Sequence, residues 1–200
     1  MADTGAPWNI PFAEPSDLVR DWPALSEDVA DAVAAGLSAA GNAGIGSNVV
    51  QTVKTDTFTS TSTSFVAVTG LTAAITPSSD TAKVLVRAQV SFGLANQAGY
   101  GWWRITGGNA GVYIGDADGS RTRAVFGGQA GTNFARDLIV ATLVYLDEPA
   151  TTSQTTYGIE VAAQLGGSAG GAFVNRSQSD DNNAINARGA SSITVIEVEA

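Results

Sequence analysis

Residues 84–92 decide the fold class, and they read VLVRAQVSF. Successive side chains of a β-strand point to opposite faces of its sheet, so alternating apolar and polar residues predict a half-buried strand. The apolar side chains of this stretch are Val84, Val86, Ala88, Val90 and Phe92. The polar side chains between them are Arg87, Gln89 and Ser91. Residues 159–165 repeat the same alternation, and these two stretches predict the core strands of a β-sheet protein.

Two further stretches are apolar at almost every position. Residues 138–146 and 193–198 therefore predict central strands that are covered on both faces, with a neighbouring subunit as one candidate cover. Other short strands are expected at 51–58, 64–69, 100–106, 111–115 and 122–126. Eight or more strands with no helical run among them predict an antiparallel, jelly-roll-like β-sandwich that occupies residues 49–200.

Residues 1–24 have a different composition and predict an extended arm. They hold four of the six prolines, each of which fixes its own φ and disfavours helix at the preceding residue. Large apolar residues lie between these prolines: Trp8, Ile10, Phe12, Leu18, Val19 and Trp22. Two interpretations stay open, because the arm can fold back on its own domain or dock these side chains on another protein.

Residues 25–41 predict one short amphipathic helix. Ser26 is the expected N-cap, and the apolar residues recur every four positions. This stripe consists of Leu25, Val29, Val33 and Leu37. A helix of this length is marginal alone in water, so the stripe is expected to cover its own domain or copies of itself around a symmetry axis. The Gly-rich residues 42–48 then predict a flexible linker.

The negative charge is concentrated at the N-terminus. The chain carries a formal charge of −9, and its first forty residues hold seven acids against the single Arg20. An acidic surface repels nucleic-acid phosphates and anionic lipids, so neither is expected as a partner. No stretch is apolar enough for a membrane span or a classical signal peptide. These observations predict a soluble protein that is made in the cytoplasm.

The chain contains no His and no Cys. Zinc sites, imidazole bases, thiol nucleophiles and disulfides are therefore excluded. A glycosidase can work with carboxylates alone, but nothing marks a catalytic pair among Glu148, Glu160, Glu197 and Glu199. The Gly-rich segments 127–131 and 166–171 lack the Gly-Lys-Ser/Thr ending of phosphate-binding loops and are expected to be mobile loops. We therefore expect no catalysis and no cofactor.

Two oxygen-rich segments are weak candidates for a cation site. Residues 116–120 read DADGS, with Asp116 and Asp118 two positions apart, but an EF-hand would need a Glu where Gly127 stands. A tight hairpin turn is the prediction here, and a cation site is the alternative. Residues 180–183 read DDNN and predict a solvated loop.

Residues 100–104 read YGWWR and are the densest aromatic feature of the chain. Alternation along a strand sends Trp102 and Trp103 to opposite faces, so one is expected in the core and the other partly outward. An outward Trp beside Arg104 could stack on a sugar ring, which makes these three residues the candidate glycan contact. Packing of the outward Trp at a subunit interface is the favoured interpretation, and the glycan contact is its alternative.

The N-terminal half of the chain resembles a known family. Residues 5–12 (GAPWNIPF), residues 14–21 (EPSDLVRD) and the Ala-rich helix after them look like the N-terminus of bacteriophage tail and minor structural proteins. The β domain that follows in such proteins is similar to residues 50–58 (VQTVKTDTF), 65–72, 75–77 and 83–86. The similar segments cover about the first 90 residues.

This resemblance implies a virion component, commonly a homotrimer, whose arm is attached to the tail or to another virion protein. Its β domain would be displayed outward, where host-surface glycan is a possible partner. Three copies of the helix could bury their apolar stripes together. A capsid or head decoration protein is the first alternative, and a free carbohydrate-binding module is the second.

Overall fold

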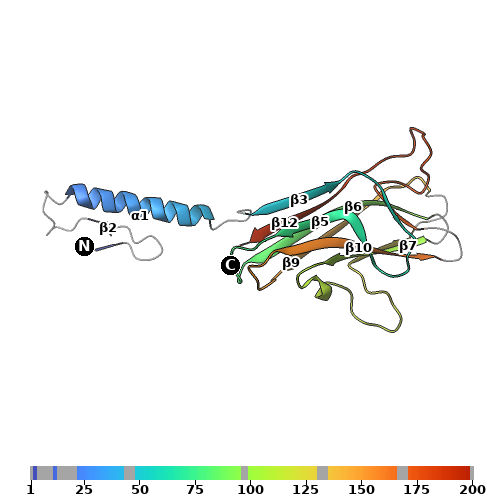
Figure 1. Ribbon diagram of the computed structural model, residues 1–200, viewed down its shortest axis with the longest axis horizontal. Helices are drawn as coiled ribbons and strands as arrows, with labels where there is room; N and C mark the ends of the chain where they lie inside the picture. Colours follow the sequence, from blue (N-terminus) through green and yellow to red (C-terminus); the bar gives the residue numbers. More distant parts are fainter. Residues whose placement is uncertain are drawn as a thin grey trace. The chain divides into compact units, whose positions relative to one another are not determined.

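The computed structural model describes residues 2–3, 11–12, 22–42, 48–95, 99–129, 135–165 and 171–198. The chain divides into two compact units, Met1–Ser47 and Asn48–Ala200 (Figure 1). The second unit, called the β unit below, contains all the long strands.

The N-terminal unit contains one helix and a two-stranded ladder. Strands β1 (Ala2–Asp3) and β2 (Pro11–Phe12) pair antiparallel, and helix α1 spans Trp22–Asn42. The helix begins three residues earlier than expected, because Pro23 fits the first turn, where its missing N–H is not needed. Ser26 therefore lies inside the helix, and its prediction as N-cap was wrong. No helix in the described part of the chain is both long and apolar enough to cross a membrane.

The candidate apolar residues of this unit are described only in part. Within α1, Val29 is half-buried and Val33 is exposed, whereas the side chains of Leu25 and Leu37 lie outside the described set. The arm residues outside the described set are Trp8, Ile10, Leu18 and Val19, together with the side chains of Phe12 and Trp22. Attachment through the arm and burial of the helix stripe stay predictions.

One sheet of the β unit has six strands: β3 (Val49–Lys54), β4 (Phe58–Ser60), β6 (Lys83–Leu94), β9 (Ile139–Asp147), β11 (Ala172–Val174) and β12 (Ser191–Val198). Long strand β6 is its centre. Strands β12 and then β11 pair along one side of β6, and β9 pairs along its other side. Strand β3 continues the sheet beyond β12, and β4 continues it beyond β11. We call this the large sheet.

The second, small sheet has the order β5 (Val66–Ile75), β10 (Thr155–Leu165), β7 (Gly99–Thr106) and β8 (Phe126–Gln129). Every pairing in both sheets is antiparallel. The segment predicted as a strand at 111–115 instead holds the 3-10 helix η2 (Ala110–Val112) and a turn. The strand expected at 122–126 instead begins at Phe126, so Gly127 and Gly128, predicted as loop, belong to β8.

The two sheets enclose one apolar core, which makes the β unit the antiparallel sandwich that the alternating residues predicted. The inner face of β6 is at most 2% exposed from Val84 to Phe92. Trp103 of the small sheet is fully buried against Phe92, with 4.9 Å between ring centroids. Ser91 was expected on the exposed face but is buried, because the segment around Gly189 packs on it. The outer face of the large sheet is therefore covered at that end.

Strand β9 is not central, contrary to the prediction from its sequence. Among the described strands it pairs with β6 alone, so it is an edge strand. Its outward side chains Val140, Val144 and Leu146 are 56%, 42% and 46% exposed. Strand β12, the other doubly apolar stretch, does lie between two partners, β3 and β6.

Candidate binding surfaces

Strand β7 separates the three predicted glycan-contact residues. Trp103 points into the core and cannot contact a ligand. Arg104 points outward, but it is paired with Glu160 at 2.6 Å and its guanidinium lies 4.1 Å from the centre of the Phe65 ring. Trp102 is half-buried on the outer face of the small sheet. Of the three residues, Trp102 is therefore the aromatic group that reaches the surface.

Small neighbours make room for the Trp102 ring. In register, Trp102 lies between Ala162 of β10 and Gly127 of β8. A Cβ atom at Gly127 would overlap Cε3 and Cζ3 of the indole, so the ring lies over this glycine. The Tyr100 ring is nearly parallel to it, at 7° with centroids 6.1 Å apart. Among the described residues the indole Nε1 has no hydrogen-bond partner and is buried, so the ring rather than its N–H faces the surface.

A depression of about 210 Å³ lies beside Trp102. Its other walls come from the loop between η2 and β8, drawn yellow-green in Figure 1, and from the start of β8. The polar or charged lining residues are Asp116, Asp118, Arg121, Thr122 and Arg123. We call this the Trp102 depression.

Internal contacts hold the loop of the Trp102 depression in place. Arg121 pairs with Asp118 at 2.7 Å, and the Arg121 N–H donates to the Asp118 carbonyl oxygen across a turn that contains Gly119 at φ +55°. The Nε–H of Arg123 donates to the carbonyl oxygen of Gly115 at 2.6 Å. A turn therefore lies within residues 116–120, but it is not the predicted hairpin turn, because no paired strands flank it. Its Asp118 carboxylate already has a cationic partner.

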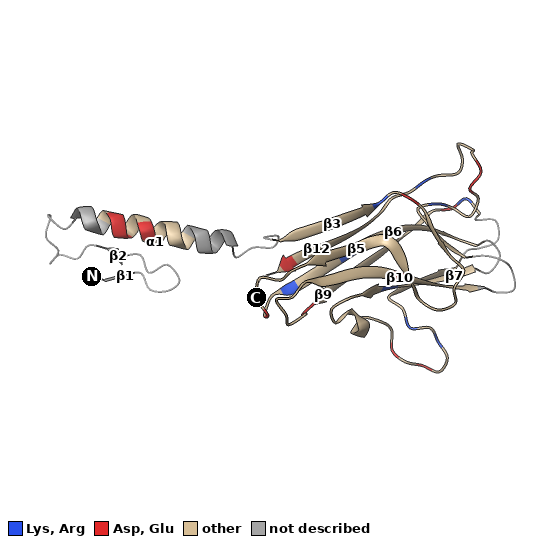
Figure 2. Cartoon of the chain, in the orientation of Figure 1, with Lys and Arg blue, Asp and Glu red and all other residues tan. Residues whose placement is uncertain are grey.

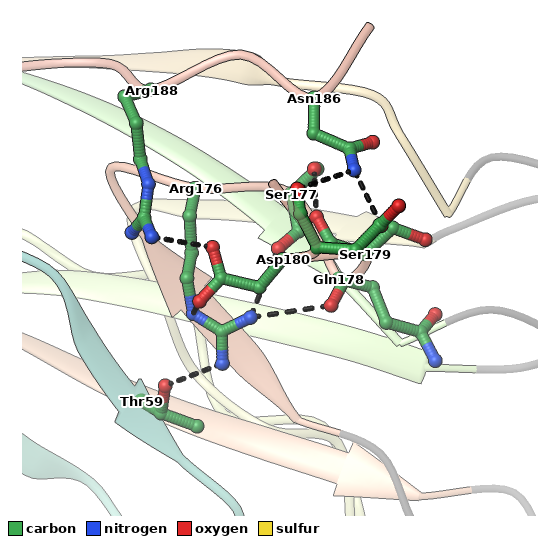
Figure 3. Close-up of polar contacts among 9 residues, drawn as sticks. Thr59, Arg176, Ser177, Gln178, Ser179, Asp180, Asn186 and Arg188 are labelled. Atoms are coloured by element: carbon green, nitrogen blue, oxygen red, sulfur yellow. Dashed lines mark hydrogen bonds and ion pairs between the residues drawn. The ribbon is translucent and has the colours of Figure 1, made fainter. Parts of the chain in front are cut away.

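The second oxygen-rich segment is likewise neutralised by arginines (Figure 3). Asp180 lies 2.6 Å from Arg188 and 3.8 Å from Arg176. Arg176 also donates to the Thr59 hydroxyl at 3.1 Å and lies 4.3 Å from the centre of the Phe173 ring, which ties the loop to β4 and β11.

Asp181 is used within the same loop, where it accepts from the Asn186 amide at 2.5 Å. Across the described ranges, no group of three or more acidic side chains is arranged to hold a metal ion. Both carboxylates of the DDNN segment thus stabilise a loop.

Two buried carboxylates connect the sheets. Asp147 of β9 is 0% exposed, and it accepts from the Tyr157 hydroxyl of β10 at 2.6 Å and from the Asn109 N–H at 3.1 Å. Burial and then this hydrogen bond raise the pKa of the Tyr157 phenol. These enclosed groups act as a structural tie between the two sheets.

Glu197 of β12 forms the second tie. It accepts from the N–H of Ser78 at 2.7 Å, from the Ser78 hydroxyl, and from the Asn48 amide at 3.3 Å. Burial alone would raise the pKa of Glu197, but the hydrogen bonds from Ser78 and Asn48 outweigh it and lower that pKa. Asn48 also donates to the Thr76 carbonyl oxygen at 3.0 Å, so the first residue of the β unit is fixed in place.

The carboxylates considered for glycosidase chemistry have other partners. Glu160 is paired with Arg104, Glu148 is paired with Lys83 at 2.6 Å, and Glu197 is buried in the tie just described. Glu199 lies outside the described residues.

The outer face of the large sheet is the second accessible surface. Four aliphatic residues stand in one row across four strands: Leu146, Leu85, Ile196 and Val49. The next row is Val144, Arg87, Thr194 and Gln51, and the third is Thr142, Gln89, Ser192 and Val53. A shallow depression of about 310 Å³ lies over the second and third rows. These twelve residues are called the aliphatic face below, after their first row. Six of them are aliphatic and six are polar, and they include no acid and one cation, Arg87.

Sequence reasoning missed one feature of these surfaces and left a second open, namely which of the two tryptophans points inward. Gly127, which was assigned to a loop, is the strand residue that makes room for Trp102. A usable signal was present for the tryptophans, because Arg104 shares a strand face with Trp102 and Ile105 shares one with Trp103.

No protein-family model matches the chain, and no curated protein matches it. Three solved structures from infectious bursal disease virus show weak similarity. The Gt strain structure is 17% identical with a TM-score of 0.37, the Gx strain structure is 14% identical with 0.35, and the VP2 subviral particle is 14% identical with 0.32. The matches cover 78%, 76% and 78% of this chain, but 39%, 36% and 39% of those chains. Similarity at this level assigns neither a family nor a function.

Proposed function

We propose that this chain is a structural protein of a virus particle, and specifically a bacteriophage tail fibre or minor tail protein. Its N-terminal unit attaches it to the particle, and its β unit is displayed outward. It works by binding rather than by catalysis.

The observation that carries this proposal is the division of the chain into two units at residues 47 and 48. The β unit builds its core from residues between Val50 and Val195. Asn48 fixes the point where the chain enters this unit, through Glu197 and Thr76. A self-sufficient β unit with a fixed entry point leaves the preceding segment available as an anchor.

The side chains of helix α1 also support an anchoring role for the N-terminal unit. Its described side chains from Ser26 to Gly36 are exposed or half-buried, and they include Glu27, Asp28 and Asp31. Figure 2 shows acidic but no basic residues on the coloured part of α1. A helix of this length gains stability mainly by packing its apolar stripe on a partner. Its partner would be other copies of the helix, or a basic or apolar socket on a neighbouring virion protein.

The aliphatic face supports a homo-oligomer, with a second copy of the chain as its occupant. Copies of a chain with charge −9 repel one another, and they approach at lowest cost where no acid is present. The aliphatic face is such a surface, and within the β unit charged residues lie mainly in loops and at strand ends (Figure 2). We propose a trimer, the state that the resemblance implies.

Deletion of residues 1–24 tests the anchor. The truncated chain should fold and keep its oligomeric state, but it should be absent from purified particles. The matched control is Val112→Ala in the full chain, because Val112 is exposed on the β unit. Normal incorporation of the truncated chain would refute attachment through the arm.

A capsid or head decoration protein is the alternative within the same class. Both roles use an anchored arm and an outward β unit, so the place of the chain on the particle decides between them. A cryo-electron density map of the assembled virion, with density for the β unit on the tail or on the head, separates the two.

A further inference from the structure

We propose that the Trp102 depression binds a neutral pyranose sugar, and that the β unit thereby recognises a neutral glycan. The inference deepens the proposed function and rests on it only for the biological setting. Sugar binding is a property of the free chain, so its failure would leave attachment through the arm unaffected.

The first argument is the Trp102 platform. The ring lies over Gly127 and beside Ala162, so the two flanking positions carry no side chain and a single methyl group, respectively. One face of a pyranose ring is lined by C–H groups, which are apolar and slightly positive. Such a face is attracted to the negative π-face of an indole and is removed from water there.

The second argument is the polar wall of the depression. It presents two carboxylates, two guanidinium groups and the Thr122 hydroxyl within reach of the same space. The Thr122 hydroxyl also accepts from the Gln164 amide at 3.4 Å. Sugar hydroxyls both donate and accept hydrogen bonds, so they need a wall that offers both kinds of group.

The charge balance selects a neutral sugar. Asp116 and Asp118 offset Arg121 and Arg123, and the Asp118–Arg121 pair is in direct contact at 2.7 Å. A uronic or sialic acid would have to compete with Asp118 for Arg121, and would lie near Asp116. Neutral hydroxyls can bind the same groups without displacing the Asp118–Arg121 pair.

The size of the depression limits how much of a glycan it holds. Its volume of about 210 Å³ is below the roughly 300–1,000 Å³ of sites that enclose drug-sized ligands. We therefore expect one sugar ring to be held, either at a chain end or within a chain that continues along the surface.

Titration of the full chain with single sugars tests the proposal. The probes are methyl α-glucopyranoside, methyl β-galactopyranoside and N-acetylglucosamine, and the readout is the set of indole N–H resonances in a ¹H–¹⁵N spectrum. At least one neutral sugar should shift the Trp102 resonance saturably and leave the buried Trp103 resonance in place. Trp102→Ala lacks this resonance, so the affinities of the native chain and of the variant are compared by calorimetric titration with the same sugar. The variant should bind about tenfold more weakly or worse.

Two further variants and one control distinguish a loss of sugar binding from a loss of folding. Gly127→Ala adds a Cβ that the Trp102 ring must move to avoid, and Arg121→Ala changes an 81% exposed side chain of the wall. Both should weaken binding while the melting temperature stays near that of the native chain. Val112→Ala, outside the depression, should leave the affinity unchanged.

Several results would overturn the assignment. One is the absence of a saturable shift with all three sugars, and another is equal affinity in Trp102→Ala. Tighter binding of glucuronate or of a short thymidine oligonucleotide would identify an anion or nucleic-acid site instead. A fall in oligomeric mass in Trp102→Ala, without sugar binding, would identify a subunit interface.

Discussion

The outer faces of the two sheets differ, although their inner faces form one common core. The large sheet presents aliphatic side chains in register across four strands, with no acid among the three rows. The small sheet presents Trp102 and Tyr100, the Arg104–Glu160 pair and a polar loop. A row of aliphatic side chains that spans four strands gains most free energy when a large partner covers it, whereas an aromatic ring beside mixed polar groups suits a small polar ligand. The two faces of one sandwich can therefore serve different partners.

Two buried carboxylates hold the two sheets together. Asp147 and Glu197 both belong to the large sheet, and their hydrogen-bond donors Tyr157, Asn109 and Ser78 belong to the small sheet or to the segments that follow its strands. A buried carboxylate is costly unless it is hydrogen-bonded, so each tie is satisfied by at least two donors.

The largest loss of stability should come from replacing the inward-facing tryptophan rather than the outward-facing one. Trp103→Ala empties a fully buried site against Phe92 and should lower the free energy of unfolding by about 3–5 kcal/mol. Trp102→Ala should cost clearly less, because its ring is half-exposed. Urea denaturation of both variants measures the difference. Equal losses would contradict the inner and outer assignment.

The hydrogen bonds of Glu197 should make the free energy of unfolding depend on pH in acid. Its lowered pKa stabilises the folded protein above the ordinary value of 4.5, and this contribution is lost as the pH falls below that value. Glu197→Gln should cost about 1–3 kcal/mol at neutral pH. The variant should also lose less stability than the native chain between pH 5 and about pH 3. Unfolding curves of the native chain and of Glu197→Gln at several pH values test this. If the free energies of unfolding of both proteins change with pH in the same way, Glu197 does not stabilise the fold through these hydrogen bonds.

The raised pKa of Tyr157 predicts the opposite dependence in alkali. Its contribution is complete below about pH 10, the ordinary value for a tyrosine, and is lost as the pH rises toward the folded-state pKa. Tyr157→Phe should flatten the alkaline fall in stability, and thermal melts at rising pH measure it. Tyr100→Phe, which changes a partly exposed tyrosine, is the matched control.

A charge on the aliphatic face should weaken self-association by roughly tenfold. Leu146→Asp places a carboxylate in the aliphatic row, where a second copy would have to desolvate it. The fold should survive, since Leu146 is 46% exposed. Sedimentation velocity over a range of concentrations is the measurement, and Val112→Asp is the control. An unchanged mass distribution would remove this face as the oligomer interface.

The smallest expected change in stability is at the edge of the Trp102 depression. The Arg121–Asp118 pair is 81% and 60% exposed, and such surface pairs contribute little. Arg121→Ala should shift the free energy of unfolding by less than about 1 kcal/mol. A larger loss in a denaturation series would show that Arg121 supports the loop, and would weaken its use as a test of sugar binding.

The sequence predicted the core strands because their signal is local. Alternation in residues 84–92 and 159–165 identified the buried side chains and the antiparallel sandwich. Strand β9 was misplaced, because an apolar stretch has the same pattern whether its second face is covered by the chain or left open. Gly127 was misassigned for a related reason: a glycine-rich run resembles a loop until a partner strand and a tryptophan ring require its missing side chain.

By itself, the amino-acid sequence determined the fold class, the absence of His and Cys chemistry and the concentration of acid near the N-terminus. Periodicity and composition involve neighbouring residues only, so they can be derived without coordinates. The tertiary structure alone decided that β9 is an edge strand, that Asp147 and Glu197 join the sheets, and that Trp102 lies beside the polar loop residues 116–123. These features depend on strand pairing between segments far apart in the chain, which no local pattern encodes.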